Sequence, residues 1–144
     1  MNINFYQTDE IIHKSIASIL SKILEDNKRA LIFCQNQELL NQINDGLWSF
    51  SKTKFIPHGK IDDEVESQKQ PILLTSKLEN NNNSDYLIML EKADDEFIKK
   101  FEKSFYFFND NNLKESKDLW RYYKNKSADL KFYKREKDKW VFVA

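Results

Sequence analysis

Short, unbroken runs of apolar residues are the feature of this sequence that most restricts its fold. Three of them lie between amphipathic or polar segments: Ala30–Cys34, Ile72–Leu74 and Tyr86–Leu90. Runs of this kind are typical of strands that are covered on both faces of a parallel sheet. Parallel strands need long crossover connections, which helices usually supply. The sequence therefore predicts an α/β fold with a mainly parallel sheet.

The rest of the chain supplies helices and further strands. Two amphipathic segments follow the cap residues Thr8 and Asn36, whose side chains suit a helix N-terminus. The other expected elements are a strand at Asn2–Tyr6, a short helix at Asp94–Phe101, a strand at Phe105–Phe108, a longer helix at Leu113–Lys126, and an antiparallel edge formed by Phe132–Tyr133 and Trp140–Val143. Alternation of strands and helices predicts a single domain, residues 1–144, with a Rossmann-like three-layer sandwich.

Composition excludes several function classes. The 23 Lys and Arg residues balance the 23 Asp and Glu residues, and the chain has only two glycines and one cysteine. We therefore expect no nucleotide-binding glycine loop, no internal disulfide and no multi-cysteine zinc site. Neither a membrane span nor a signal peptide is apparent. These features predict a cytoplasmic protein without cofactor or metal.

The segment Glu79–Asp85, with the tract Asn80–Asn83 at its centre, is the low-complexity part of the sequence. Asparagine side chains compete for backbone hydrogen bonds and favour turns and loops. We expect this tract to be a solvent-exposed loop that can be shortened with little effect on stability.

Candidate catalytic residues are few. His58 is close in sequence to Asp62 and Asp63, which leaves an acid–base enzyme as one hypothesis. His13 has no second ligand at a metal-binding spacing, and Cys34 ends a predicted buried strand, where cysteine is usually a small apolar side chain. A protein without catalytic residues is the favoured interpretation.

One candidate binding surface lies in the connection after the second predicted helix. Large apolar and turn-forming residues crowd into it: Trp48, Phe50, Phe55, Pro57 and His58. They either fill the core or form a protein-binding surface, because aromatic anchors are enriched at the centres of interfaces.

The C-terminal part of the chain has a local excess of positive charge. Residues 111–144 hold ten Lys and Arg against five Asp and Glu, a net charge of +5. At ~100° per residue, four cations of the predicted helix share one arc, here called the basic strip, and two aromatic residues border it: Lys114, Lys117, Arg121 and Lys124, with Trp120 and Tyr123. Such a strip is either a solvated helix face, a site for an acidic peptide that ends in an aromatic residue, or a site for single-stranded nucleic acid.

Several short motifs occur in a fixed order along the chain. They are Phe5-Tyr6, Ala30–Cys34, Leu47-Trp48-Ser49-Phe50, Phe55-Ile56-Pro57-His58-Gly59, Gln70–Thr75 and Lys117-x-x-Trp120-Arg121-x-Tyr123. In this order they resemble the chi subunits of bacterial DNA polymerase III. Two departures are Lys117, where the family commonly has Arg, and Ser127–Leu130, which lacks a glycine usual in relatives.

This resemblance implies a non-catalytic adaptor subunit of the clamp-loader assembly with a Rossmann-like fold. The adaptor would link the psi subunit to the acidic C-terminal tail of the single-stranded-DNA-binding protein, and would contact nucleic acid only indirectly. The psi-binding surface would contain Trp48, Phe50, Phe55, Pro57 and His58, and the tail-binding surface Lys114, Lys117, Trp120, Arg121, Tyr123 and Lys124. The chain would be a monomer or a heterodimer with psi. Direct binding of single-stranded nucleic acid by the basic strip is the alternative.

Overall fold

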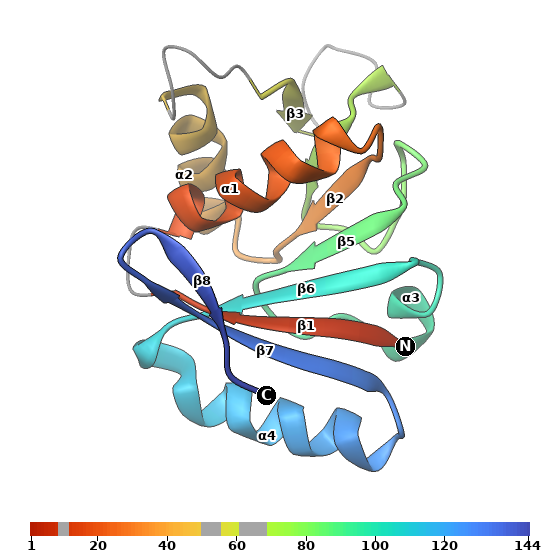
Figure 1. The fold of residues 1–144 in the computed structure, drawn as a ribbon. Helices are drawn as coiled ribbons and strands as arrows, with labels where there is room; N and C mark the ends of the chain where they lie inside the picture. The colour runs from red at the N-terminus through yellow and green to blue at the C-terminus, as the bar shows by residue number, and fades with distance from the viewer. Residues whose placement is uncertain (9–11, 50–55, 61–68) are drawn as a thin grey trace.

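The computed structural model describes residues 1–8, 12–49, 56–60 and 69–144, and its centre is an eight-stranded sheet (Figure 1). The described elements are β1 (Asn2–Gln7), α1 (Ile12–Glu25), β2 (Ala30–Phe33), α2 (Gln37–Ser49), β3 (His58–Lys60), β4 (Ile72–Thr75), β5 (Tyr86–Met89), α3 (Asp95–Ile98), β6 (Lys103–Phe108), the 3-10 turn η2 (Asp110–Asn112), α4 (Leu113–Asn125), β7 (Asp129–Glu136) and β8 (Lys139–Phe142).

The sheet confirms the predicted α/β class. Its strand order is β3-β4-β2-β5-β6-β1-β7-β8, and every neighbouring pair is parallel except the β7–β8 hairpin. The predicted antiparallel edge is this hairpin, but β7 also pairs in parallel with β1, which the sequence did not indicate. β3 was not predicted either, because a three-residue strand next to turn-forming residues shows no periodicity.

Two hydrophobic cores hold the layers together, one on each face of the sheet (Figure 1). The first contains the buried faces of α1 and α2, with residues such as Ile16 and Leu40. The second lies under α3 and α4 and is rich in aromatic rings, among them Phe5 and Phe108. The β2 strand is buried along its whole length because both cores cover it, as the apolar run predicted.

Local hydrogen bonds explain where some helices begin. The Asn36 side chain accepts a hydrogen bond from the backbone N–H of Leu39 at 3.1 Å, which confirms the predicted cap of α2. The buried Thr8 hydroxyl pairs with the Ser15 hydroxyl inside α1, whose described part begins at Ile12. Residues 9–11 lie outside the described part of the chain, so the predicted Thr8 cap stays a prediction. No helix in the described part of the chain is long and apolar enough to span a membrane.

The asparagine tract is not the dispensable loop that the sequence predicted. Asn82 is 1% exposed, and its Nδ2 donates to the backbone oxygens of Ala30 at 3.3 Å and of Gln70 at 2.9 Å. Its Oδ1 accepts a hydrogen bond from the Ser84 hydroxyl at 2.5 Å. The side chain satisfies buried backbone groups where β2 and β4 begin, so this prediction was wrong at Asn82.

The turn after α4 forms without glycine. Ser127 has a φ of 57°, and the N–H of Ala128 returns to the carbonyl oxygen of Tyr123 at 3.1 Å, which closes the helix end. Glycine is the usual residue in this left-handed position, because a Cβ atom there meets the neighbouring backbone. Ser127 therefore forms this turn at a cost in backbone strain.

Candidate functional site

The α4 helix turns its cations to solvent and its buried residues to the sheet. Ser116 and Tyr123 point toward the sheet and are 2% and 1% exposed, whereas Lys117 and Arg121 are exposed to solvent. Trp120 lies between these two directions and is half-buried. This arrangement follows from the helical period, which sets Trp120 between the buried side and the basic strip.

Trp120 is one of a cluster of four aromatic rings. The Trp120 ring meets the Phe5 ring edge-on at 5.2 Å between centroids, and the Phe132 ring lies 6.2 Å from the Trp120 ring. Phe108 completes the cluster at 5.8 Å from Phe132 and 6.4 Å from Phe5. The rings meet because β1 aligns Phe5 with Phe132 of β7, and because β6, the other neighbour of β1, contributes Phe108.

These rings form the floor of an open pocket of about 470 Å³ between α4 and the sheet. Lys117 and Arg121 line it together with Trp120, so two cations stand next to an apolar floor. Arg121 also pairs with Asp118 at 3.3 Å, but both side chains are more than half exposed. An exposed pair of this kind contributes little and exchanges readily with another carboxylate. The pocket is therefore suited to a ligand with an aromatic group and a negative charge.

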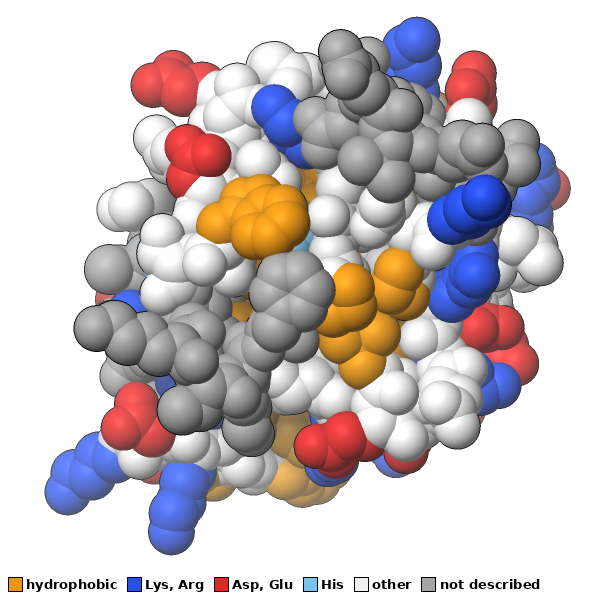
Figure 2. All heavy atoms as spheres, turned by 90° about the horizontal axis from the view of Figure 1, so that it is seen from above, with side chains coloured by type: hydrophobic (Ala, Val, Ile, Leu, Met, Phe, Trp, Pro, Cys, Tyr) orange, Lys and Arg blue, Asp and Glu red, His pale blue; other side chains and the backbone are white. Residues whose placement is uncertain are grey.

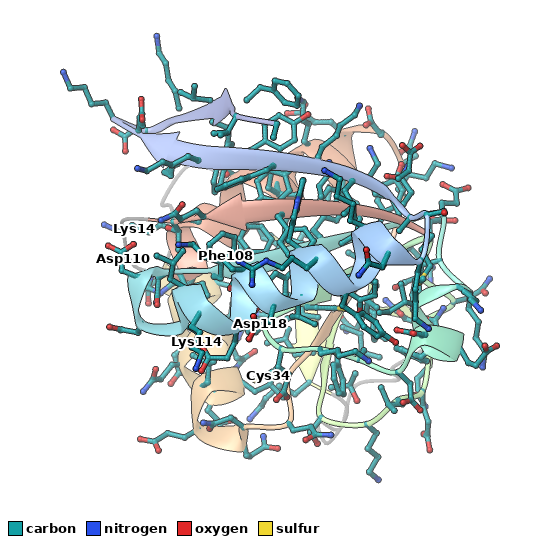
Figure 3. The ribbon with its side chains drawn as sticks, turned by 90° about the horizontal axis from the view of Figure 1, so that it is seen from below. Lys14, Cys34, Phe108, Asp110, Lys114 and Asp118 are labelled. Atoms are coloured by element: carbon teal, nitrogen blue, oxygen red, sulfur yellow. The ribbon has the colours of Figure 1, made fainter. Side chains whose placement is uncertain are left out.

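The structure separates the residues of the predicted tail-binding set. Tyr123 is buried in the core below α4, and burial raises the pKa of its hydroxyl, so it cannot border a surface site. Lys114 lies on the side of α4 away from Phe108, next to Asp118 (Figure 3), and neither it nor Lys124 lines the pocket. The sequence did not identify the floor residues Phe5, Phe108 and Phe132, because only the parallel pairing of distant strands brings them together.

The second candidate surface lies at the other edge of the sheet, where α2 ends. Trp48 is 56% exposed, so it does not fill the core. Its ring packs against the His58 ring at 4.5 Å between centroids. Figure 2, which views the molecule from above Figure 1, shows exposed apolar side chains on this face.

His58 is a support for this surface and not a part of it. It is 4% exposed, its Nδ1 lies 2.7 Å from the Ile56 carbonyl oxygen, and its Nε2 lies 3.3 Å from that of Asn44. These contacts fix the ring beneath Trp48, so the predicted role of His58 in this surface would be to support the Trp48 ring. Pro57 is half-buried beside it.

Some predicted site residues lie outside the described part of the chain: Phe50, Phe55, Asp62 and Asp63. Within the described residues, no group of three or more His, Cys, Asp or Glu side chains is arranged to hold a metal ion. Cys34 is 2% exposed, and burial raises the pKa of its thiol, with a weaker opposing effect from the Asn36 backbone. A buried thiol with a raised pKa is a poor nucleophile.

Comparison with known proteins identifies the family. The family model described as DNA polymerase III chi subunit, HolC, matches residues 1–131. The chain belongs to the DNA polymerase III chi subunit family. A probable DNA polymerase III subunit chi from Rickettsia prowazekii (strain Madrid E) is 31% identical over 106 residues, which cover 69% of this chain and 64% of that protein.

The fold has a solved neighbour outside the chi family. It is described as "Mss116p DEAD-box helicase domain 2 bound to an RNA duplex", with a TM-score of 0.60 and 12% identity over 96% of this chain and 66% of that one. At this identity the likeness concerns the fold alone, and it agrees with the predicted Rossmann-like class. The family match ends at residue 131, so most of β7 and all of β8 lie beyond it in this chi-family chain.

Proposed function

We propose that this chi-family chain is a non-catalytic adaptor of the DNA polymerase III assembly, and that the α4 pocket binds the acidic C-terminal tail of the single-stranded-DNA-binding protein. One observation carries this proposal: Lys117 and Arg121 flank a floor of aromatic rings. A peptide that ends in an aromatic residue offers a ring for the floor and a free carboxylate for the cations. An adaptor of bacterial replication would work in the cytoplasm.

Apolar burial must contribute most of the affinity. Exposed ion pairs contribute about 0.2–1 kcal/mol each, whereas a micromolar complex needs roughly −8 kcal/mol. Burial of a phenyl ring adds about 1.5–3 kcal/mol, and further contacts along the peptide supply the rest. We expect binding in the micromolar range with moderate salt dependence. Lys117 is a point charge, whereas the resemblance implies an Arg at this position in the family. We therefore expect a lower affinity than an Arg at position 117 would give.

Two charge reversals of equal size test the pocket. Arg121→Glu places a negative charge at its rim, whereas Lys134→Glu changes the net charge equally on β7, outside the pocket. Calorimetry with a synthetic peptide of acidic residues followed by a C-terminal Phe should show binding lost in the first variant and retained in the second. Equal losses would mean that diffuse positive charge binds the peptide. Amidation of the peptide C-terminus should weaken binding to the wild type.

Direct binding of single-stranded nucleic acid remains the second candidate function, because the exposed cations of the basic strip also suit phosphates. Salt dependence does not separate the two, since both ligands are polyanions. A titration with oligo-dT at the same ionic strength does. If the wild type binds oligo-dT and ignores the peptide, the nucleic-acid function replaces the adaptor function.

We further propose that Trp48 is an anchor for the psi subunit. Its exposed ring on a fixed histidine support is the geometry of an interface anchor. Trp48→Ala should weaken capture of psi in a pull-down with purified subunits while the unfolding curve keeps its cooperativity. Phe142→Ala is the matched control, because Phe142 is 60% exposed and lies at the opposite edge of the sheet. Equal capture by both variants would remove Trp48 from the interface.

A further inference from the structure

The β8 strand is an apolar edge that the described part of the chain leaves uncovered. It is the last strand of the sheet, and three consecutive exposed apolar residues lie at its end and directly after it: Val141 (41%), Phe142 (60%) and Val143 (53%). Natural proteins usually protect edge strands with charges, prolines or a covering segment, because a free edge pairs with other chains. A continuous apolar edge of this kind indicates an interaction surface.

The hairpin fixes which backbone groups of β8 point outward. Lys137 and Asp138 have φ values of 47° and 65°, which is the geometry of a two-residue hairpin turn. Val143 donates its N–H to the Phe132 oxygen at 2.8 Å, so it faces β7. Hydrogen-bonding direction alternates along a strand, so Val141 also faces β7. The N–H and C=O groups of Trp140 and Phe142 consequently point to the free edge.

We propose that β8 pairs antiparallel with β8 of a second copy of this chain, with Val141 on the two-fold axis. In this register Trp140 of each copy lies opposite Phe142 of the other, so all the outward-facing groups of β8 form hydrogen bonds. An axis at Phe142 would set Trp140 opposite Ala144, whose N–H and C=O already bond to Phe132. An axis at Trp140 would set Phe142 opposite Asp138, which lies in the turn.

The side chains of β8 are complementary to themselves in the same register. Trp140 donates its indole N–H to the Ser18 hydroxyl at 3.1 Å, and Phe142 meets the Tyr133 ring at 5.5 Å, so both lie on the face covered by α1. Across the axis they form two Trp–Phe pairs. On the other face Val141 meets Val141 and Lys139 meets Val143. Like charges do not face each other, and aromatic cross-strand pairs stabilise sheets. This self-complementarity favours a second copy over an unrelated partner.

The inference does not rest on the proposed function, although the two are connected in space. Ala144, next to the exposed Val143, borders the α4 pocket. Pairing of two copies through β8 therefore brings two pockets into one assembly. A partner that carries several acidic tails would bind such an assembly with higher avidity than a single chain.

A cysteine on the axis tests the register. In the proposed register, Val141 forms a non-hydrogen-bonded pair with Val141 of the second copy. Cα atoms in such a pair are ~4.5 Å apart, a separation that a disulfide can bridge. Val141→Cys should give a disulfide-linked dimer under mild oxidation. Lys139→Cys, which faces Val143, should cross-link much more slowly. The wild type should stay uncross-linked because Cys34 is buried.

Sedimentation velocity tests the association without cysteines. The wild type should show a concentration-dependent shift toward the dimer, and Phe142→Lys should abolish it while the peptide affinity stays the same. Monomeric behaviour of the wild type at the highest concentration would overturn the proposal. Equal cross-linking of Val141→Cys and Lys139→Cys, or preferred cross-linking through Phe142→Cys, would also overturn it. None of these outcomes depends on whether the α4 pocket binds a peptide.

Discussion

Asn82 is a buried polar residue whose removal should destabilise this protein strongly. Its side chain makes three hydrogen bonds, to the carbonyl oxygens of Ala30 and Gln70 and to the Ser84 hydroxyl. In addition, its own carbonyl oxygen accepts a hydrogen bond from the Arg29 guanidinium at 2.9 Å. The Asn82→Ala variant loses the three side-chain bonds, and the carbonyl oxygens of Ala30 and Gln70 each lose one donor.

The expected loss follows from the number and burial of these bonds. Each intramolecular hydrogen bond contributes roughly 1 kcal/mol net, and an unsatisfied buried group costs about 1–3 kcal/mol. Asn82→Ala should therefore lower the free energy of unfolding by about 3 kcal/mol. Because native domains are stable by only about 5–15 kcal/mol, this loss is easily measured. Urea unfolding followed by circular dichroism gives the difference.

Asn81→Ala is the control for this measurement. Asn81 is the neighbouring residue in the same tract and is exposed, so its truncation should change the free energy of unfolding by less than about 0.5 kcal/mol. If the two variants have the same stability, Asn82 does not hold the ends of β2 and β4 together. The tract would then be the dispensable loop that its composition suggests.

Two further changes test the α4 region. Ser127→Gly should raise the free energy of unfolding by about 1 kcal/mol, because glycine removes the strain of a positive φ; no change in a urea titration would show that Ser127 is unstrained. Burial alone would raise the pKa of Asp95, but the Tyr122 hydroxyl and the Lys126 ammonium outweigh it, so the pKa is lowered. The folded protein thus gains stability from this carboxylate above its unfolded pKa and loses it as the pH falls through the folded pKa. Asp95→Asn should cost stability at pH 7, and this cost should shrink steadily as the pH is lowered from 4 toward 2, as measured by unfolding over this range.

The sequence predicted the layers of the fold better than it predicted the site. Ala30–Phe33 and Tyr86–Met89 are strands because unbroken apolar runs of this length occur where both faces of a sheet are covered. Sequence periodicity reports which residues are buried, but not which distant residues become neighbours. The pairing of β1 with β7, which brings Phe132 to Phe5, left no signal in either segment.

Tyr123 and Asn82 show the same limit within single segments of the chain. The helical arc correctly placed Lys117 and Arg121 near Trp120, but it treated Tyr123 as a surface residue. Only the position of the sheet decides which flank of the arc is buried. Composition likewise marked Asn82 as part of a loop, although a loop asparagine with its side chain turned inward becomes part of the core.

The positions of the two proposed surfaces predict that their partners bind independently. Trp48 belongs to α2, which packs on one face near β3, and the α4 pocket lies on the other face near β7, with five strands between β3 and β7 (Figure 1). Coupling between sites needs an element with two arrangements that both ligands bias, and a continuously buried parallel sheet offers none. The peptide affinity should therefore be the same, within error, for the free chain and for the chain saturated with psi. A change of tenfold or more would show that the sheet transmits binding from one face to the other.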